Sequence, residues 1–258
     1  MNSKTITSNE IEITYRTYGD GPKAVLLVHG WMVSSAVWQW LLPSLDLKGR
    51  RVIVPDLRGA GASGRPTESY TLAAYAQDLV AVLEDATCAQ ATVVGHSMGG
   101  QIAQYLAVHH ADRVSALVGL CPVPASGMAL PEDAKGLFRT SGGDRGKQAT
   151  ILSLACKSLT EERREVMLDD AATVSSAAIS QGFDAWAAGF EGDLATVAVP
   201  TLIVATDDPF LPVDFLRQSI ASKVQNGRIA YLPGAGHYPQ VERSAETLAV
   251  LEAFLANS

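Results

Sequence analysis

The residues with the clearest chemical potential lie in the octapeptide Val-Val-Gly-His-Ser-Met-Gly-Gly at positions 93–100. Ser97 is two positions from Gly95 and two from Gly99, directly after the apolar run 91–94. This Gly-x-Ser-x-Gly spacing is typical of a sharp strand-to-helix turn that exposes the serine and leaves no room for neighbouring side chains. A helix that begins after Ser97 would also present backbone N–H groups that stabilise negative charge. The pattern therefore predicts that Ser97 is a nucleophile, although it also occurs in ordinary glycine-rich turns.

A serine nucleophile needs a base, and the base needs an acid that orients it. Of the five histidines, only His237 follows both the serine and a candidate acid, and it lies in the loop sequence Pro-Gly-Ala-Gly-His-Tyr-Pro. The acid is expected after the late apolar segment Thr-Leu-Ile-Val-Ala, where Asp207 and Asp208 compete. Asp208 is favoured because the proline that follows biases it toward an extended conformation, whereas Asp207 could stabilise the turn instead. His96 is expected to point its ring away from Ser97.

Attack on a carbonyl group would also require two backbone donors for the developing oxyanion. Met98 is predicted to supply one N–H, since it directly follows the nucleophile. Trp31 is predicted to supply the other from the segment His-Gly-Trp-Met, where Gly30 lets the backbone come close. The side chains expected to line the substrate pocket are largely apolar, and they are Trp31, Met32, Trp186, Phe190, Phe210 and Tyr238.

The scaffold for these residues is predicted from the alternation of strand and helix patterns, which indicates a parallel sheet covered on both faces. A hairpin is expected around Ser8 and Asn9. Further strands are expected at 24–28, 51–55, 91–95, 114–121, 200–205 and 228–232. Helices are expected at 34–42, 70–85 and 98–110, after the segment Pro-Val-Asp-Phe at 212–215, and from 244 onward.

The alternation stops between positions 123 and 199. This segment is rich in Ala, Ser and Gly, has scattered helical signals and contains no clear strand. We therefore predict a helical cap at 123–199, inserted into an α/β core that is formed by 1–122 and 200–258.

Composition limits the classes of partner. The chain has 258 residues, a net charge of −7 and 47% apolar residues, so an acidic surface is expected and neither nucleic acid nor membrane is expected as a partner. The first residues lack the apolar core of a signal peptide, and no apolar run reaches the ~18 residues of a membrane helix. Three widely spaced cysteines without a Cys-x-x-Cys pair indicate neither a zinc site nor a disulfide framework. We expect a cytoplasmic protein that acts on a small molecule, uses no metal or cofactor, and could form a homodimer.

Five segments in this order resemble proteins with the α/β-hydrolase fold, in particular its serine-nucleophile esterase and haloperoxidase-like branch: L-L-V-H-G-W, V-P-D-L-R-G-A-G-A-S, V-V-G-H-S-M-G-G, V-P-T-L-I-V-A-T-D-D-P-F-L-P and G-A-G-H-Y-P. The resemblance covers nearly the whole chain. It implies a mostly parallel eight-stranded sheet with a helical cap inserted after the sixth strand. It also supports Asp208, because the family's acid usually lies three residues after a small residue and four before a proline. Ala205 stands where that small residue is usually glycine, which leaves Asp207 open.

These residues predict a serine hydrolase that cleaves a small, largely apolar ester, thioester or lactone through an acyl-serine intermediate. The alternatives within the same fold are a carbon–carbon bond hydrolase and a cofactor-free haloperoxidase or perhydrolase. Two more distant alternatives are a cofactor-independent dioxygenase that cleaves heteroaromatic rings and a ligand-binding protein without catalysis, because a fold does not determine one function.

Overall fold

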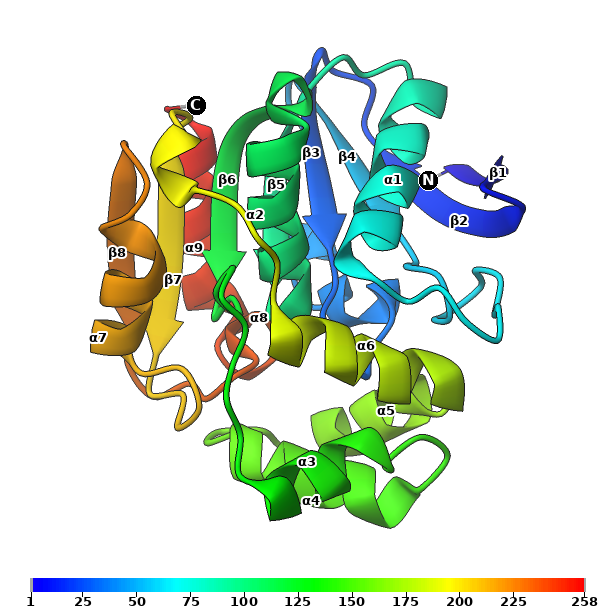
Figure 1. Cartoon of the computed structure of the whole chain (residues 1–258). Helices are drawn as coiled ribbons and strands as arrows, with labels where there is room; N and C mark the ends of the chain where they lie inside the picture. The colour runs from blue at the N-terminus through cyan, green and yellow to red at the C-terminus, as the bar shows by residue number, and fades with distance from the viewer. Residues whose placement is uncertain (1, 258) are drawn as a thin grey trace.

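The computed structural model describes residues 2–257 and contains an eight-stranded sheet with helices on both faces (Figure 1). The strand order is β1-β2-β4-β3-β5-β6-β7-β8. Pairs β1–β2 and β2–β4 are antiparallel, and the other five pairs are parallel. The strands are β1 (Asn2–Ser8), β2 (Ile11–Tyr18), β3 (Lys23–Val28), β4 (Arg50–Pro55), β5 (Ala91–His96), β6 (Val114–Leu120), β7 (Thr201–Thr206) and β8 (Gly227–Leu232). The predicted α/β fold with a mostly parallel eight-stranded sheet is confirmed.

The central strands are mostly apolar because helices cover both of their faces. Every residue of β5 is buried, and the register places Leu26 of β3 beside Ile53 of β4 and Val93 of β5. The edge strand β1 is mostly exposed. The buried centre fixes the carboxyl ends of β3, β5 and β7 at one end of the sheet, where ligands of open α/β sheets usually bind.

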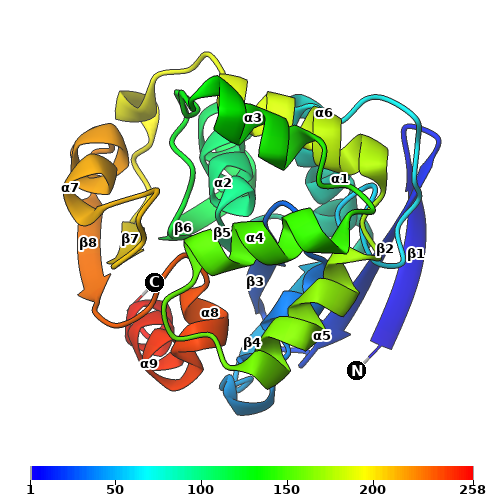
Figure 2. The ribbon, with the colours of Figure 1, turned by 90° about the horizontal axis from the view of Figure 1, so that it is seen from below.

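The core helices cover the two faces of the sheet. Helices α1 (Leu72–Asp85) and α2 (Met98–His109) lie on one face, and α8 (Pro239–Glu242) and α9 (Ser244–Leu255) lie on the other (Figures 1 and 2). The short helix α7 (Val213–Leu216) continues into a π-helical turn at Arg217–Ala221. Helix α2 packs on β5 and β6, so its first residue lies at the carboxyl end of β5.

Four helices lie between β6 and β7 in the chain: α3 (Glu132–Arg139), α4 (Arg145–Ala155), α5 (Glu161–Ala171) and α6 (Ser176–Ala188). They form a layer across the carboxyl ends of the central strands (Figure 2). Side chains that accept a hydrogen bond from the first turn cap three of these helices, and these caps are Asp144, Thr160 and Ser175. We refer to this layer as the cap.

The helix expected at 34–42 is wrong. The structure has two short 3₁₀ helices there, Ser35–Trp38 and Leu42–Ser44. The backbone N–H groups of Val37, Gln39 and Leu41 each donate to the carbonyl three residues earlier, which is the tighter 3₁₀ pattern rather than the α-helical one. Across residues 2–257, no helix has both the length and the apolar character that crossing a membrane requires.

Candidate active site

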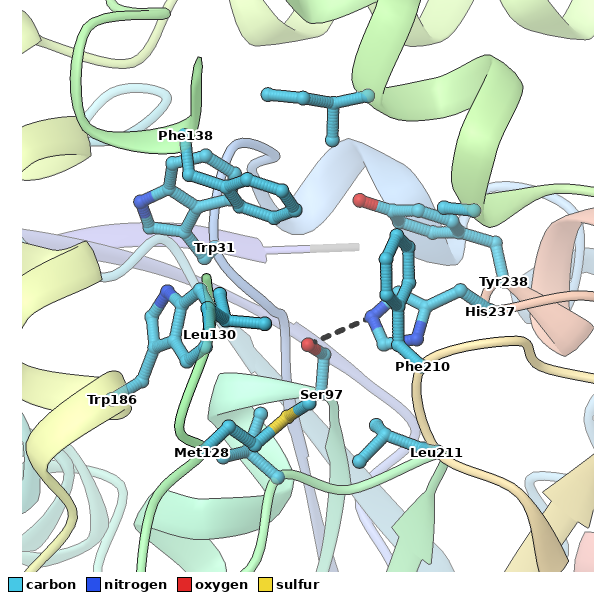
Figure 3. Close-up of a pocket in the computed structure, with 13 residues that line it drawn as sticks. Trp31, Ser97, Met128, Leu130, Phe138, Trp186, Phe210, Leu211, His237 and Tyr238 are labelled. Carbon is cyan, nitrogen blue, oxygen red and sulfur yellow. Dashed lines mark hydrogen bonds between the residues drawn. The ribbon is translucent and has the colours of Figure 1, made fainter. Parts of the chain in front are cut away.

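Ser97 occupies the turn between β5 and α2 with φ 54° and ψ −119°, a conformation that costs energy in any residue other than glycine. The flanking glycines make this turn sterically accessible. A Cβ atom on Gly95 would lie 2.2 Å from the Gly99 carbonyl oxygen, and one on Gly99 would lie 2.4 Å from the carbonyl oxygen of His29. The strained turn directs the Ser97 hydroxyl into a cavity between the sheet and the cap (Figure 3).

A continuous hydrogen-bonded path leads from the serine to a buried acid. The Ser97 hydroxyl lies 2.9 Å from Nε2 of His237, and Nδ1 of His237 lies 2.6 Å from a carboxylate oxygen of Asp208. Asp208 is 3% exposed, and its second oxygen accepts a bond from the Phe210 N–H at 2.8 Å. This arrangement orients the imidazole so that Nε2 can take the serine proton.

The neighbouring Asp207 points away from His237. Its carboxylate accepts hydrogen bonds from the Tyr231 hydroxyl and from the Gly234 N–H, and it lies 3.8 Å from the ammonium group of Lys157. The Tyr231 hydroxyl, followed by the Gly234 N–H, lowers the pKa of Asp207. Asp207 therefore stabilises the surface turn, which leaves Asp208 as the acid beside His237.

The backbone of His237 is fixed on both sides. Its N–H donates to the Ala155 carbonyl oxygen of α4 at 2.8 Å, and its carbonyl oxygen accepts from Nε2 of His96 at 2.9 Å. The ring of His96 packs against those of His237 and Tyr238, and it is not among the residues that line the cavity in front of Ser97. Burial lowers the pKa of His96 well below its usual value, which keeps its ring neutral.

A buried carboxylate holds the residues on either side of the histidine. Glu242 accepts hydrogen bonds from the N–H groups of Gly236 at 3.0 Å and Tyr238 at 3.1 Å. The same side chain accepts from the N–H groups of Lys157 and Ser158, each at 2.7 Å, in the connection between α4 and α5. Glu242 therefore ties the histidine loop to the cap.

The two candidate oxyanion donors meet at the serine. A Cβ atom on Gly30 would lie 3.1 Å from the Cβ of Ser97, so the Gly30–Trp31 peptide lies directly against the nucleophile. As the first residue of α2, Met98 has an N–H without an acceptor inside its helix. The backbone N–H of Trp31 also donates to no acceptor within residues 2–257. Both groups are thus free to bind an oxyanion.

The orientation of the Gly30–Trp31 peptide is set by His29. The Leu57 N–H donates to Nε2 of His29 at 2.9 Å, so Nδ1 carries the hydrogen and donates to the Gly30 carbonyl oxygen at 2.8 Å. Because the C=O and N–H of a trans peptide point in opposite directions, this bond also sets the direction of the Trp31 N–H. Burial lowers the pKa of His29, consistent with a neutral ring in this role.

The Trp31 side chain reaches from the sheet into the cap. Its indole N–H donates to the carbonyl oxygen of Ile179 in α6 at 2.8 Å. Its ring stacks on Phe138 of α3 at a centroid distance of 5.5 Å and contacts Phe183 and Trp186 of α6. The residue whose backbone faces Ser97 is therefore also a principal contact between the core and the cap.

The cavity around Ser97 has a volume of about 50 Å³. Four of the predicted pocket residues line it, namely Trp31, Trp186, Phe210 and Tyr238 (Figure 3). The other lining residues are Ser97, Val123, Met128, Leu130, Phe138, Ile151, Ala155, Leu211 and His237. Most of these come from the cap and its connections, where the sequence pattern indicates helices but not which face is buried.

Two predicted pocket residues lie elsewhere. Met32 is fully buried beneath the loop after β3, beside Leu57 and Val33, and does not line the cavity. Phe190 packs against Tyr105 and His109 of α2. Their apolar character reflects packing in both cases, because neither side chain faces Ser97.

Sequence reasoning did not single out Glu242, although it contacts both neighbours of the histidine. In the sequence it resembles an ordinary helix-surface glutamate, and its partners at 157 and 158 lie about 85 positions away.

Within residues 2–257, no three His, Cys, Asp or Glu side chains lie close enough together to form a metal site.

Comparison with known proteins gives matches along almost the whole chain. The model of the alpha/beta hydrolase family matches residues 25–250. The non-heme haloperoxidase of Rhodococcus erythropolis is 29% identical over 259 residues, which cover 89% of this chain and 90% of that protein. The crystal structure of a bromoperoxidase from Bacillus anthracis is similar with a TM-score of 0.91 at 26% identity, covering 99% of this chain and 100% of that one. Est816, an N-acyl homoserine lactone degrading enzyme, has a TM-score of 0.83 at 25% identity, covering 97% of this chain and 100% of that one.

Proposed function

The chain belongs to the alpha/beta hydrolase family, and from this premise we propose that it is a serine hydrolase that forms an acyl-serine intermediate. The observation that carries the proposal is the hydrogen-bonded path from Ser97 through His237 to Asp208. The proposed substrate is a small, largely apolar ester, thioester or lactone.

In the first half of the reaction, Nε2 of His237 removes the Ser97 proton while the serine oxygen attacks the substrate carbonyl carbon. The Asp208 carboxylate stabilises the imidazolium that forms, because it accepts the Nδ1 hydrogen. General-base assistance of this kind contributes about 10²–10⁴-fold in rate. The tetrahedral intermediate then collapses, and the imidazolium gives its proton to the departing alcohol or thiol.

The N–H groups of Trp31 and Met98 would hold the oxyanion of this intermediate. Loss of a single donor of this kind costs about 10²–10³-fold in turnover. In the second half of the reaction, His237 removes a proton from water while the water oxygen attacks the acyl carbon. The second tetrahedral intermediate then collapses, the imidazolium gives its proton to the Ser97 oxygen, and the acid departs.

The cavity supports the proposed substrate class. At about 50 Å³ it has room for a small organic group, since ~10–15 Å³ on this measure holds one water. Its lining is mostly aliphatic and aromatic, and no Asp, Glu, Lys or Arg side chain of the described residues lines it. An uncharged substrate fits such a site, because burial of an unpaired charge costs much more than burial of an apolar group.

The proposal is tested by covalent labelling and turnover. We expect a fluorophosphonate probe to label the wild-type protein and not Ser97→Ala, with both proteins folded as judged by their melting temperatures. Short-chain aryl esters, thioesters and lactones are then assayed with both proteins. A folded wild type that neither reacts with the probe nor turns over any of these substrates would refute the proposed function.

Perhydrolysis is a second candidate, supported by the similarity to a non-heme haloperoxidase at 29% identity. In this reaction hydrogen peroxide replaces water, so that attack on the acyl-serine releases a peracid instead of an acid. The assay adds hydrogen peroxide to a hydrolysed ester and measures peracid against carboxylic acid. A product ratio equal to that of the uncatalysed mixture would exclude this candidate.

A further inference from the structure

The proposed mechanism makes no use of one polar group in the cavity, the hydroxyl of Tyr238. Tyr238 directly follows His237, is 3% exposed, and its ring packs against those of His96 and His237 at centroid distances of 4.6 and 5.2 Å. The hydroxyl points into the cavity, toward the space that the Ser97 hydroxyl also faces (Figure 3).

This hydroxyl has no hydrogen-bond partner in the part of the chain that the structure describes, residues 2–257. A buried tyrosine hydroxyl usually has a partner, because removal of the group from water is unfavourable without one. Apart from Ser97 and His237, the residues that line the cavity are apolar, and the hydroxyl reaches the open space of the cavity rather than being enclosed by protein. A molecule in the cavity, either water or substrate, is therefore the available source of an acceptor.

The electrostatic surroundings keep the hydroxyl protonated. Burial raises the pKa of Tyr238, and the nearby Cys156, Asp170, Asp208 and Glu242 raise it further. The group therefore acts as a neutral donor. No Lys or Arg of the described residues lines the cavity, so an uncharged oxygen acceptor fits better than an anion, whose burial without a cation is costly.

We propose that Tyr238 determines specificity by donating a hydrogen bond to a second oxygen of the substrate, separate from the carbonyl oxygen that is attacked. The substrate class is then an ester, thioester or lactone that carries an ether, hydroxyl or keto oxygen. This inference rests on the proposed function. A purely hydrocarbon substituent at the same place would leave the Tyr238 hydroxyl unpaired, and sites that hydrogen-bond a substrate reject analogues without the polar atom.

The position of Tyr238 separates this role from that of the oxyanion donors. Trp31 and Met98 lie in the turns after β3 and β5, whereas Tyr238 lies in the loop after β8. A second oxygen could belong to the acyl part or to the alcohol part of the substrate, and the test below covers both.

The test uses two pairs of esters in which one oxygen replaces one methylene group. Methyl methoxyacetate and methyl butyrate differ in the acyl part, and 2-methoxyethyl acetate and butyl acetate differ in the alcohol part. The ratio of kcat/KM within each pair is measured for the wild type and for Tyr238→Phe, so that intrinsic reactivity cancels. We expect the preference for oxygen to fall about tenfold or more in one pair, in line with the loss of a buried hydrogen bond.

The matched control is Tyr231→Phe, which removes the hydroxyl of an exposed tyrosine that bonds Asp207 outside the cavity. It is expected to leave both ratios unchanged. If Tyr238→Phe leaves both ratios unchanged, or lowers kcat/KM equally for all four esters, the specificity role is refuted.

Binding separates this inference from the proposed function. Dissociation constants of the four esters are measured by ligand-observed NMR in Ser97→Ala and in the double variant with Tyr238→Phe. If the wild type turns over no ester but the double variant loses the preference for oxygen in binding, the proposed function fails while the role of Tyr238 stands. If the double variant binds all four esters as Ser97→Ala does, the role of Tyr238 is refuted.

Discussion

Replacement of Glu242 by glutamine should loosen the histidine loop from the cap. The two carboxylate oxygens divide four backbone donors between them. One oxygen accepts from Lys157, Ser158 and Gly236, and the other accepts from Tyr238. Glutamine has almost the same shape but only one acceptor oxygen, so its amide NH₂ must face at least one backbone N–H.

The magnitude follows from these contacts. A hydrogen bond to a charged group contributes about 1.5–3 kcal/mol, and a buried donor left unpaired costs about as much. If the amide oxygen keeps the three-donor position, Glu242→Gln loses the bond from Tyr238 and weakens the other three. We expect a loss of about 3 kcal/mol in the free energy of unfolding, which corresponds to a melting temperature lower by ~6–12 °C for a chain of this size.

The assay combines thermal unfolding with steady-state kinetics well below the melting temperature. We expect kcat to fall about tenfold or more, because a displacement of about 1 Å in a catalytic group can cost ~10²-fold, while KM changes less. The control is Glu246→Gln, the same charge change at an exposed residue that pairs with Arg243. If the two variants melt within 2 °C of each other and have the same kcat, the reasoning about Glu242 is refuted.

Two further predictions concern the acid and the buried histidines. Asp208→Asn should lower kcat by about 10⁴-fold, because His237 loses the acceptor that fixes its tautomer. Asp207→Asn should change kcat less than about twofold, because the Asp207 carboxylate faces the surface. If instead Asp207→Asn lowers kcat more than Asp208→Asn does, Asp207 is the acid. Burial lowers the pKa values of His29 and His96, so below about pH 6.5 the unfolded chain binds more protons than the folded protein. The free energy of unfolding should therefore decrease as the pH is lowered, by up to about 1.4 kcal/mol per pH unit for each histidine. The free energy of unfolding, measured with urea between pH 7.5 and 5, should change less steeply with pH for His96→Gln than for the wild type. The same pH dependence in both proteins would contradict a neutral His96.

The parts of the fold and site that could be predicted from sequence depend on local patterns. The strand that leads to Ser97 and the helix that follows it are encoded in adjacent residues. The choice between Asp207 and Asp208 was narrowed by a local rule about proline, and the structure then places only Asp208 against His237.

The rest of the site depends on contacts between distant segments. Glu242 could not be distinguished from a surface glutamate, because its partners at 157 and 158 belong to the cap. Phe138 lines the cavity because of the way α3 is oriented on the core. Hydrophobic periodicity in the sequence can predict a helix, but it does not predict that orientation. Phe190 misled the prediction because aromatic character does not tell whether a ring covers the cavity or another helix.

The contact of Trp31 with the cap has a consequence for the recombination of this protein with its relatives. A cap exchanged alone would replace helix α6, whose Ile179 backbone carbonyl accepts the indole N–H, and the ring of Phe138 on which the indole stacks. The indole would then shift, and with it the peptide that faces Ser97. The segment 29–34 and the cap should therefore be exchanged together, so that the residue at position 31 keeps the cap residues against which it packs.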